Sequence, residues 1–462
     1  MIQKKRIVVL GGGFGGLGAA RHLDRTFRDD EDVDITLISD TNFLVYSPLL
    51  AEVAGGTIEP RYAVPPLRTF LRKKVRVQEA TVERIDVAAQ KITVTYSKGD
   101  WDEWQGELDY DYLVIALGAT TNTRHAMGVT TYAVGLKDLP DAMFLRNRVL
   151  TMLERAEDTT DPKLRQELLT FVVAGGGFSG VESIGALDDL AHGALRFYPG
   201  IRPSELHFIL APHGHRLLTE VDQRLGEYVV QKFQNRDIDV RMGVGVTAVT
   251  AHTATLTTGE VIPTRTVVWT TGVEVNPVLQ RVDLPKDRHG AIVVNNRLQV
   301  EGHPHIFAVG DCAAVPMPDG GGTYSLTAQN ATREGPVAAK NVAAMVRNVG
   351  TLKPFNYKPM GSLASLGCRQ AVAQIEQVHL SGLLAWIAWR GVYLFKLPTL
   401  TDRMLVLLDW MTDLVAPVDI VQVPLGRKRF VGAMMADESR TATPATTAKE
   451  QQPASGQSVP SH

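Results

Sequence analysis

Apolar runs that end in glycine recur along the chain. The β-branched run Arg6–Leu10 is followed by the glycine-rich stretch 11–16, by a helical stretch through Leu23 and by a second apolar run at Asp34–Ile38. Strand, glycine turn, helix and strand in this order form the βαβ unit of dinucleotide-binding proteins. The pattern therefore predicts a nucleotide site at the first turn.

The same order returns in the middle of the chain. Phe171–Ala174 predicts a strand, 175–180 a glycine turn, Val181–Ala191 a helix and Leu206–Leu210 the next strand. A lone glycine motif is weak evidence and can be a tight turn without a ligand. Here, however, each copy stands between a strand and a helix, as phosphate binding requires. Two copies predict two nucleotide sites.

Three further apolar runs end at glycine or aspartate: Tyr112–Gly118, Thr266–Gly272 and Ile306–Asp311. Near-continuous apolar runs are typical of parallel strands that are buried on both faces, and ligands bind at the carboxyl ends of such strands. We therefore predict an α/β protein with two Rossmann-like dinucleotide-binding domains.

Each glycine of the first turn has its own expected role. Gly11 allows the tight turn, Gly13 lets a pyrophosphate approach the backbone, and Gly16 lets helix and strand pack closely. The helix that follows offers N–H groups and the positive end of its dipole to the phosphates. Gly175, Gly177 and Gly180 would serve the second site in the same way.

An acidic residue at the end of the second strand usually holds the adenosine ribose. In the first unit the candidate is Asp40, one position after Ser39, and a helix or turn cap is an equally good interpretation. In the second unit the strand ends Leu210-Ala211-Pro212-His213, without an acid. We expect weak discrimination between NADH and NADPH, with NADH preferred.

Two other carboxylates are candidates. Asp311 at a strand end favours a bond to a flavin ribityl hydroxyl over a turn cap. Glu182, early in the second glycine-turn helix, is well placed to stabilise the helix start, and this is compatible with a position beside the nicotinamide. Cys312 is interpreted as a small packed residue.

Composition narrows the class of protein. An apolar fraction of 44% is ordinary for a globular protein, and a net charge of −2 gives no reason to expect nucleic acid. Two distant cysteines, Cys312 and Cys368, exclude a disulfide scaffold and a CxxC pair and fit a reducing compartment. The histidines show no metal-ligand spacing, so we assign no metal. No stretch reaches the roughly 18 apolar residues that span a bilayer.

The C-terminal part differs in character. Leu380–Leu397 and Thr399–Val415 predict two apolar helices rich in aromatic residues, with Arg390, Lys396 and Arg403 among them. Such helices suit a membrane surface, where aromatic rings lie at the interface and cations reach the headgroups. A helical dimer interface is the alternative. Residues 431–462 have the composition of a disordered tail.

As a set, five stretches resemble the type II NADH:quinone oxidoreductases, single-subunit respiratory dehydrogenases that do not pump protons. Val8–Leu17 is similar to the family's FAD turn, Ser47–Ala54 to its segment beside the flavin, and Gly175–Glu182 to its nicotinamide motif. Ala328–Gly335 resembles the quinone-side motif, and Gly361–Gly367 also matches. In three places the chain departs from the family pattern: Ser47 before Pro48 and Arg333 each replace a glutamine, and the ribose acid of the second unit is missing.

The resemblance implies a glutathione-reductase-like fold with an FAD-binding domain at 1–122 and 285–355 and an NAD(P)H-binding domain at 123–284. It implies a membrane-association region at 356–430, through which the protein binds peripherally to the cytoplasmic face of the cell membrane. A homodimer is compatible with this arrangement. Hydride passes from NADH, or NADPH, to FAD, and two electrons then pass to a membrane quinone, ubiquinone or menaquinone.

The resemblance also implies the site residues. Those expected at FAD are Gly11, Gly13, Phe14, Gly15, Gly16, Ser39, Asp40, Pro48, Val82, Gly118, Gly310, Asp311 and Gln329. Those expected at NAD(P)H are Gly175, Gly177, Phe178, Ser179, Gly180, Glu182 and Gly272. The expected catalytic residues are Glu182, Gln329 and Arg333.

Two alternatives remain open. A sulfide:quinone oxidoreductase shares the fold but needs active-site cysteines that handle sulfur at the flavin. A flavin-bearing interaction module without turnover would not need the second glycine motif or Gln329.

Overall fold

The computed structural model describes residues 4–96, 103–123, 126–397 and 399–423. The first glycine turn belongs to a six-stranded sheet of order β19-β20-β7-β1-β2-β3, parallel except for its β19 edge. Its strands are β1 (Lys5–Leu10), β2 (Val33–Ser39), β3 (Val75–Glu79), β7 (Tyr112–Ile115), β19 (Gln299–Val300) and β20 (His303–Ala308). All four residues of β7 are buried, as a central parallel strand requires.

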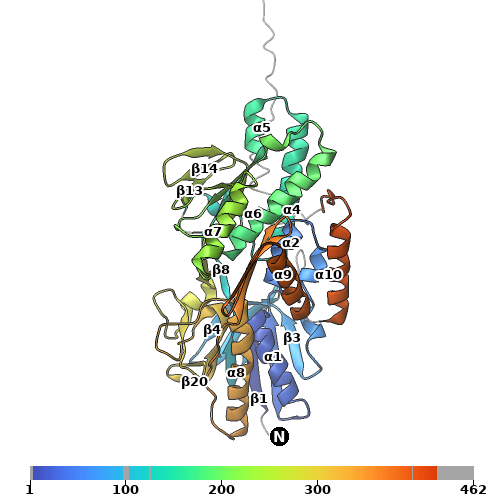
Figure 1. Ribbon diagram of the computed structural model, residues 1–462. Helices are drawn as coiled ribbons and strands as arrows, with labels where there is room; N and C mark the ends of the chain where they lie inside the picture. Colours follow the sequence, from blue (N-terminus) through green and yellow to red (C-terminus); the bar gives the residue numbers. More distant parts are fainter. Residues whose placement is uncertain (1–3, 97–102, 124–125, 398, 424–462) are drawn as a thin grey trace, which may run out of the picture. The chain divides into compact units, whose positions relative to one another are not determined.

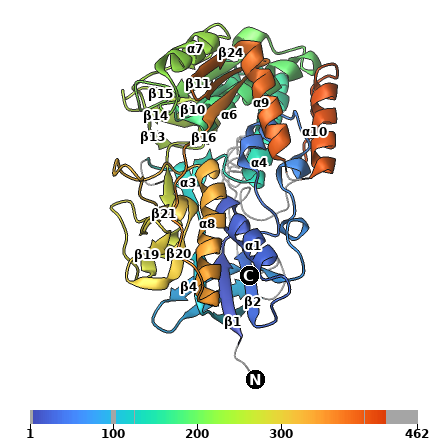
Figure 2. The same cartoon turned by 60° about the horizontal axis from the view of Figure 1, so that its bottom comes forward.

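Helices α1 (Phe14–Thr26) and α8 (Ala328–Arg347) lie side by side next to this sheet (Figures 1 and 2). They touch through small residues. A Cβ on Gly335 would lie 2.1 Å from the Gly15 carbonyl oxygen, and one on Gly18 would lie 3.2 Å from Pro336 Cδ. The two backbones therefore meet with no side chain between them.

The second glycine turn belongs to a five-stranded parallel sheet of order β12-β11-β10-β16-β9. Its strands are β9 (Ala133–Val134), β10 (Thr170–Ala174), β11 (His207–Ala211), β12 (Asp239–Val240) and β16 (Thr266–Trp269). The helices around it are α3 (Val129–Tyr132), α4 (Leu139–Asp158), α5 (Pro162–Leu169), α6 (Phe178–Ala194) and α7 (Gln223–Gln234). The sequence pattern predicts that this helix starts at Val181, three residues too late, because Phe178, Ser179 and Gly180 already belong to α6.

Smaller sheets complete these two bodies. They are β4–β6 (Thr81–Asp86, Lys91–Tyr96, Trp104–Asp109), β13–β15 (Val246–Val249, Thr253–Leu256, Val261–Pro263), β8 with β17 (Ala119–Thr121, Val273–Val275) and β18 with β21 (Ile292–Val293, Ala313–Ala314). The short helix α2 (Leu50–Ala54) packs on α4 and α6, so its apolar side chains join the second core although the sequence places this segment in the FAD-binding domain. The domain boundaries themselves stay a prediction.

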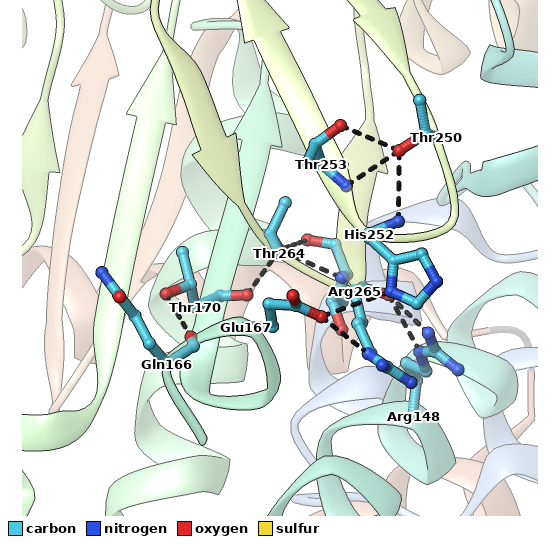
Figure 3. A network of polar contacts seen from close by, with 10 residues as sticks. Arg148, Gln166, Glu167, Thr170, Thr250, His252, Thr253, Thr264 and Arg265 are labelled. Carbon is cyan, nitrogen blue, oxygen red and sulfur yellow. Dashed lines mark hydrogen bonds and ion pairs between the residues drawn. The ribbon is translucent and has the colours of Figure 1, made fainter. Parts of the chain in front are cut away.

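A polar network joins α5 to the end of the sheet β13–β15 (Figure 3). The Glu167 carboxylate pairs with Arg265 Nε at 3.2 Å and His252 Nδ1 at 3.3 Å, while the Thr264 hydroxyl donates to the Thr170 carbonyl at 2.6 Å. These contacts fasten the small sheet to the parallel sheet and have no part in the site described below.

The C-terminal region forms the antiparallel sheet β22 (Gly361–Gly367), β23 (Gln370–Ile375) and β24 (Val378–Ser381), followed by α9 (Gly382–Lys396) and α10 (Leu400–Asp413). The sheet packs between α6 and α9, and α10 lies beside α9 (Figure 2). The expected helix at Leu380–Leu397 therefore begins after a short strand. Residues 424–430 and the expected tail at 431–462 lie outside the described residues.

In the described part of the chain, no helix is both long and apolar enough to span a bilayer. Two expectations about α9 and α10 are wrong. Trp389 and Trp410 are 1% and 2% exposed, so they face the protein rather than lipid. Arg390 stacks on Trp386 and Trp410 and bonds to Asp413, so it does not extend towards solvent.

Candidate active site

The first glycine turn leaves an open cradle at the start of α1. Gly11 has φ +104°, and a Cβ there would lie 2.1 Å from the Ala116 carbonyl oxygen. A Cβ on Gly16 would lie 1.9 Å from the Gly11 carbonyl oxygen, whereas one on Gly13 meets no atom within 4 Å. Gly11 and Gly16 are thus required by the turn and the helix–strand contact. Only Gly13 opens space for a ligand, in agreement with the three expected roles.

The second turn repeats this geometry. Gly175 has φ +119°, a Cβ on Gly180 would lie 2.1 Å from the Gly175 carbonyl oxygen, and Gly177 faces open space. Both helices begin directly after the open glycine, at Phe14 and Phe178. Their N–H groups therefore point to the places where two pyrophosphates would lie. The space in front of Gly15 is filled, because a Cβ there would lie 3.1 Å from Val309 Cγ2. Ser179 lies in the first turn of α6.

Open space also lies at the glycines that follow two central strands. Gly118 after β7 and Gly272 after β16 have φ of +65° and +76°, and a Cβ on either meets no atom within 4 Å. These two glycines lie at the carboxyl ends of the sheets, beside the two cradles.

Asp311 lies in a single 3-10 turn, Gly310–Cys312, directly after β20. Glu334, and not Asp311, caps this turn, because the Gly310 N–H donates to the Glu334 carboxylate at 2.6 Å. The Asp311 carboxylate accepts no hydrogen bond from the described residues and faces the ammonium of Lys137, which opposes the rise of its pKa on burial. Its bonding capacity is thus available to a ligand, which supports the flavin role over the cap.

Ser39 and Asp40 stand at the carboxyl end of β2, where the ribose end of the first site is expected. Ser39 is the last residue of β2 and its Oγ lies 2.5 Å from the position of a Cβ on Gly12. Asp40 is exposed and caps no helix or turn among the described residues, which removes the capping alternative. Val82 follows nearby on β4, two residues beyond Ala80, whose N–H donates to the Ser39 carbonyl.

The ribose end of the second site has no acid. The Gly175 N–H donates to the Ala211 carbonyl as the Gly11 N–H does to Ile38, so Pro212 occupies the position of Ser39. Pro212 Cβ lies 2.7 Å from the position of a Cβ on Gly176, and the Ala211 side chain is fully buried. In this register Pro212 and His213 stand where Ser39 and Asp40 stand in the first site, and neither is an acid.

The side chains near Pro212 that could bind a phosphate on the ribose differ in how far the protein itself holds them. Arg216 donates to the Val221 carbonyl and is thereby held in the protein. His213 and His215 are exposed and pack on the segment 243–245.

A cavity of about 1160 Å³ lies where the starts of α1 and α6 meet α8 and the C-terminal helix α9. Phe14 and Phe178, the first residues of α1 and α6, both line it. Its remaining wall includes Tyr46, Pro48, Gln329, Arg333, Tyr357, Tyr393 and Lys396. The structure thus brings the expected Pro48, Gln329 and Arg333 together with residues of both glycine turns.

Gln329 is largely occupied by the protein itself. Its amide oxygen accepts from Tyr357 OH and from the Met360 N–H, both at 2.8 Å, and its amide nitrogen donates to the Gly361 carbonyl at 3.2 Å. Gln329 therefore fixes the cavity wall 357–361. Arg333, one helical turn further, is exposed and lies 5.5 Å from the Tyr357 ring centroid.

Glu182 lies in the second turn of α6, largely buried. Its Oε1 accepts from the Ser365 N–H at 3.0 Å and from Trp389 Nε1 at 3.2 Å. Burial raises the pKa of Glu182 to about 8, so this carboxyl is mostly protonated at neutral pH. A carboxyl with such a pKa can give or take a proton at neutral pH.

Comparisons with known proteins decide between the alternatives. The family model of pyridine nucleotide-disulphide oxidoreductases matches residues 5–335, and that of the NDH2 C-terminal domain matches residues 360–416. The type II NADH:quinone oxidoreductase NdhA of Mycobacterium tuberculosis is 34% identical over 422 residues, which cover 88% of this chain and 86% of the relative. The chain belongs to the type II NADH:quinone oxidoreductases.

Other similarities agree with this family. A probable NADH dehydrogenase of Dictyostelium discoideum is 32% identical over 424 residues, 91% of this chain and 92% of that one. The structure of NDH2 from Plasmodium falciparum in complex with NADH covers 90% of this chain and 100% of its own, with a TM-score of 0.82 at 22% identity, and shares the fold. The resemblance and the fold class that the sequence predicts are confirmed.

As a type II NADH:quinone oxidoreductase, the protein uses FAD as its cofactor and NADH as its electron donor. The first cradle fits FAD. Gly13 leaves room for the pyrophosphate, Gly118 leaves the backbone bare, and Asp311 offers unused acceptors to the ribityl chain.

The cysteines do not fit sulfide chemistry. Cys312 is fully buried, its thiol donates to the Val309 carbonyl at 3.3 Å, and burial raises its pKa to about 12. Cys368 lies between β22 and β23 against Asp189. Among the described residues that line the cavity there is no cysteine.

The site contacts of three residues of this type II NADH:quinone oxidoreductase escaped sequence reasoning, which expected Lys396 at lipid headgroups. Lys137 reaches Asp311 from the loop before α4, and Lys396 closes the cavity from α9. Glu52 is 8% exposed and accepts a bond from Trp410 Nε1 at 3.1 Å. Each meets its partner only through tertiary contacts, so no local sequence signal marks them.

We expect Gly13→Val to lose most of its FAD while keeping its fold. Gly13 has φ −71° and ψ −172°, an extended conformation that valine adopts readily, so the side chain only fills the cradle. The flavin-to-protein absorbance ratio of purified, folded protein measures the loss. Gly391→Val is the matched control, because a Cβ there also meets no atom within 4 Å. Full flavin content in folded Gly13→Val would contradict the assignment.

Proposed function

We propose that this enzyme reduces a membrane quinone at the cavity between α8 and α9, without pumping protons. The observation that carries the proposal is the convergence of Phe14, Phe178, Arg333 and Lys396 on one cavity. Bound FAD supplies the chemistry, because it takes a hydride from NADH and gives two electrons to the quinone.

The residues of the chain bind and orient the reactants. Phe178 and Glu182 lie on α6 on the nicotinamide side, whereas Pro48 and Gln329 shape the quinone side. Arg333 and Lys396 place positive charge where a quinone oxygen becomes negative during reduction. Burial is the main cause that lowers the pKa of Lys396, and the positive charge of Arg333 lowers it further. The two cations therefore lie close together.

We expect Arg333→Gln to slow flavin reoxidation by quinone about tenfold, equivalent to about 1.4 kcal/mol, and to leave flavin reduction by NADH unchanged. Stopped-flow absorbance resolves the two half-reactions. Arg347→Gln is the control on the same helix, because that guanidinium bonds to the Thr26 carbonyl and stacks on Phe27. Equal slowing of both half-reactions would refute a quinone-side role.

We propose that NADPH is also accepted, with NADH preferred, because Pro212 can neither bond to the ribose hydroxyls nor repel a 2′-phosphate. The exposed His213 and His215 are the nearest candidate partners for that phosphate.

Pro212→Glu should raise the ratio of kcat/KM for NADH over NADPH at least about tenfold through charge repulsion. Pro212→Ala is the control for loss of the proline ring and should leave the ratio near that of the parent. An unchanged ratio in the glutamate variant would mean that selectivity is set elsewhere.

We further propose that α9 and α10 bind the cytoplasmic face of the cell membrane. Their outer side is aliphatic. Leu384 on α9 is 68% exposed and Met404 on α10 is 61% exposed, and Leu383, Ile387, Phe395, Leu400, Leu408 and Met411 are also exposed. A row of this kind inserts into the interfacial region of a bilayer. A homodimer interface is the competing use of the same surface.

The double variant Leu384→Glu/Leu408→Glu should abolish sedimentation with liposomes, because two carboxylates would have to leave water. The exposed Val261 on β15 provides the control, Val261→Glu, which should sediment like the parent. If the double variant instead turns a dimer into a monomer and still sediments, the surface is a dimer interface.

A further inference from the structure

Helix α9 has two different faces. Its outer face carries the exposed Leu384 and Ile387, whereas its inner face carries the buried Trp389 and, one turn later, Tyr393. The two inner rings are 4.8 Å apart, and Tyr393 and Lys396 line the cavity. The helix proposed to meet the membrane thus also reaches the site.

The inner face of α9 binds one oxygen of the Glu182 carboxyl. Trp389 Nε1 and the Ser365 N–H both donate to Oε1, at 3.2 and 3.0 Å. No donor among the described residues bonds to Oε2. The carboxyl therefore has one oxygen fixed by the protein and one available for a proton.

The titratable neighbours of Glu182 come from two elements. Glu52 on α2 raises the pKa of Glu182 by its charge, and Tyr393 on α9 interacts with the Glu182 charge. The bonds from Ser365 and Trp389 act in the opposite direction, because both favour the ionised carboxylate.

A parallel contact lies close by on α10. Trp410 Nε1 donates to Glu52 Oε2 at 3.1 Å, and the rings of Trp389 and Trp410 are 6.1 Å apart. Each C-terminal helix thus donates one indole N–H to one buried glutamate. The two contacts are chemically alike but engage different carboxyls, so the second is a matched control for the first.

We propose that Trp389 is a positioning residue for the reaction, whose indole N–H holds the Glu182 carboxyl and sets its proton affinity from the membrane-facing helix. The proposal rests on the proposed place of Glu182 beside the nicotinamide. It gives α9 a role in the chemistry in addition to its outer surface.

The test compares Trp389→Phe with Trp410→Phe in the holoenzyme. Infrared spectroscopy follows the C=O band of the protonated carboxyl against pH, and Glu182→Gln identifies the band. Loss of a donor to the ionised form should raise the midpoint, about 8 in the parent, by about one unit in Trp389→Phe, a tenfold higher proton affinity. Trp410→Phe should produce no upward shift.

Kinetic measurements link the bond to the reaction. The pH profile of flavin reduction should move to higher pH in Trp389→Phe. The double variant Trp389→Phe/Glu182→Gln should have the same pH profile as Glu182→Gln alone. An unchanged infrared midpoint in folded Trp389→Phe would overturn the proposal. If the midpoint moves but Glu182→Gln keeps the parent's rate and pH profile, the indole bond stands and the active-site role of Glu182 fails.

The unaltered protein provides a second test in case Trp389→Phe does not fold. The indole ¹⁵N–H resonance of Trp389 should shift with pH at the Glu182 midpoint, and Glu182→Gln should abolish that shift. A resonance that does not respond to pH would contradict the proposal.

Discussion

The approach of a diphosphate to bare backbone is the interaction on which most of this structure depends. A helix offers its free N–H groups to phosphate only where no side chain stands in front of them. Gly13 and Gly177 meet that need, and the helices start directly after them. Gly11 and Gly175 must then turn the chain in a left-handed conformation, and the parallel sheets fix where the turns lie.

The C-terminal helices solve a different problem, because they face protein on one side and carry an aliphatic row on the other. A buried indole N–H and a buried carboxyl are each unfavourable without a partner. Trp389 with Glu182 and Trp410 with Glu52 remove both penalties at once. Leucine, isoleucine and methionine have no polar group to satisfy and can occupy the outer surface.

Local patterns predicted both nucleotide units, because glycine roles and strand order are written in consecutive residues. They failed where a side chain's direction depends on distant segments. Trp389 turns inward, where its ring packs on Tyr393 and Trp410 and its N–H meets Glu182 on α6. Arg390 is enclosed by aromatic rings rather than free for headgroups. The register of the two turns aligns Pro212 with Ser39, a correspondence that the apolar run alone does not give.

The glycine contact between α1 and α8 has a consequence for electron transfer. Helix α1 starts at the pyrophosphate cradle, and α8 carries Arg333 at the cavity. Since Gly335 meets the Gly15 carbonyl without an intervening side chain, the two helices cannot slide past each other without a clash. The FAD cradle and the proposed quinone site are therefore carried by two helices that are fixed against each other. Because the two helices cannot shift against each other, the spacing between these two sites stays the same from one turnover to the next.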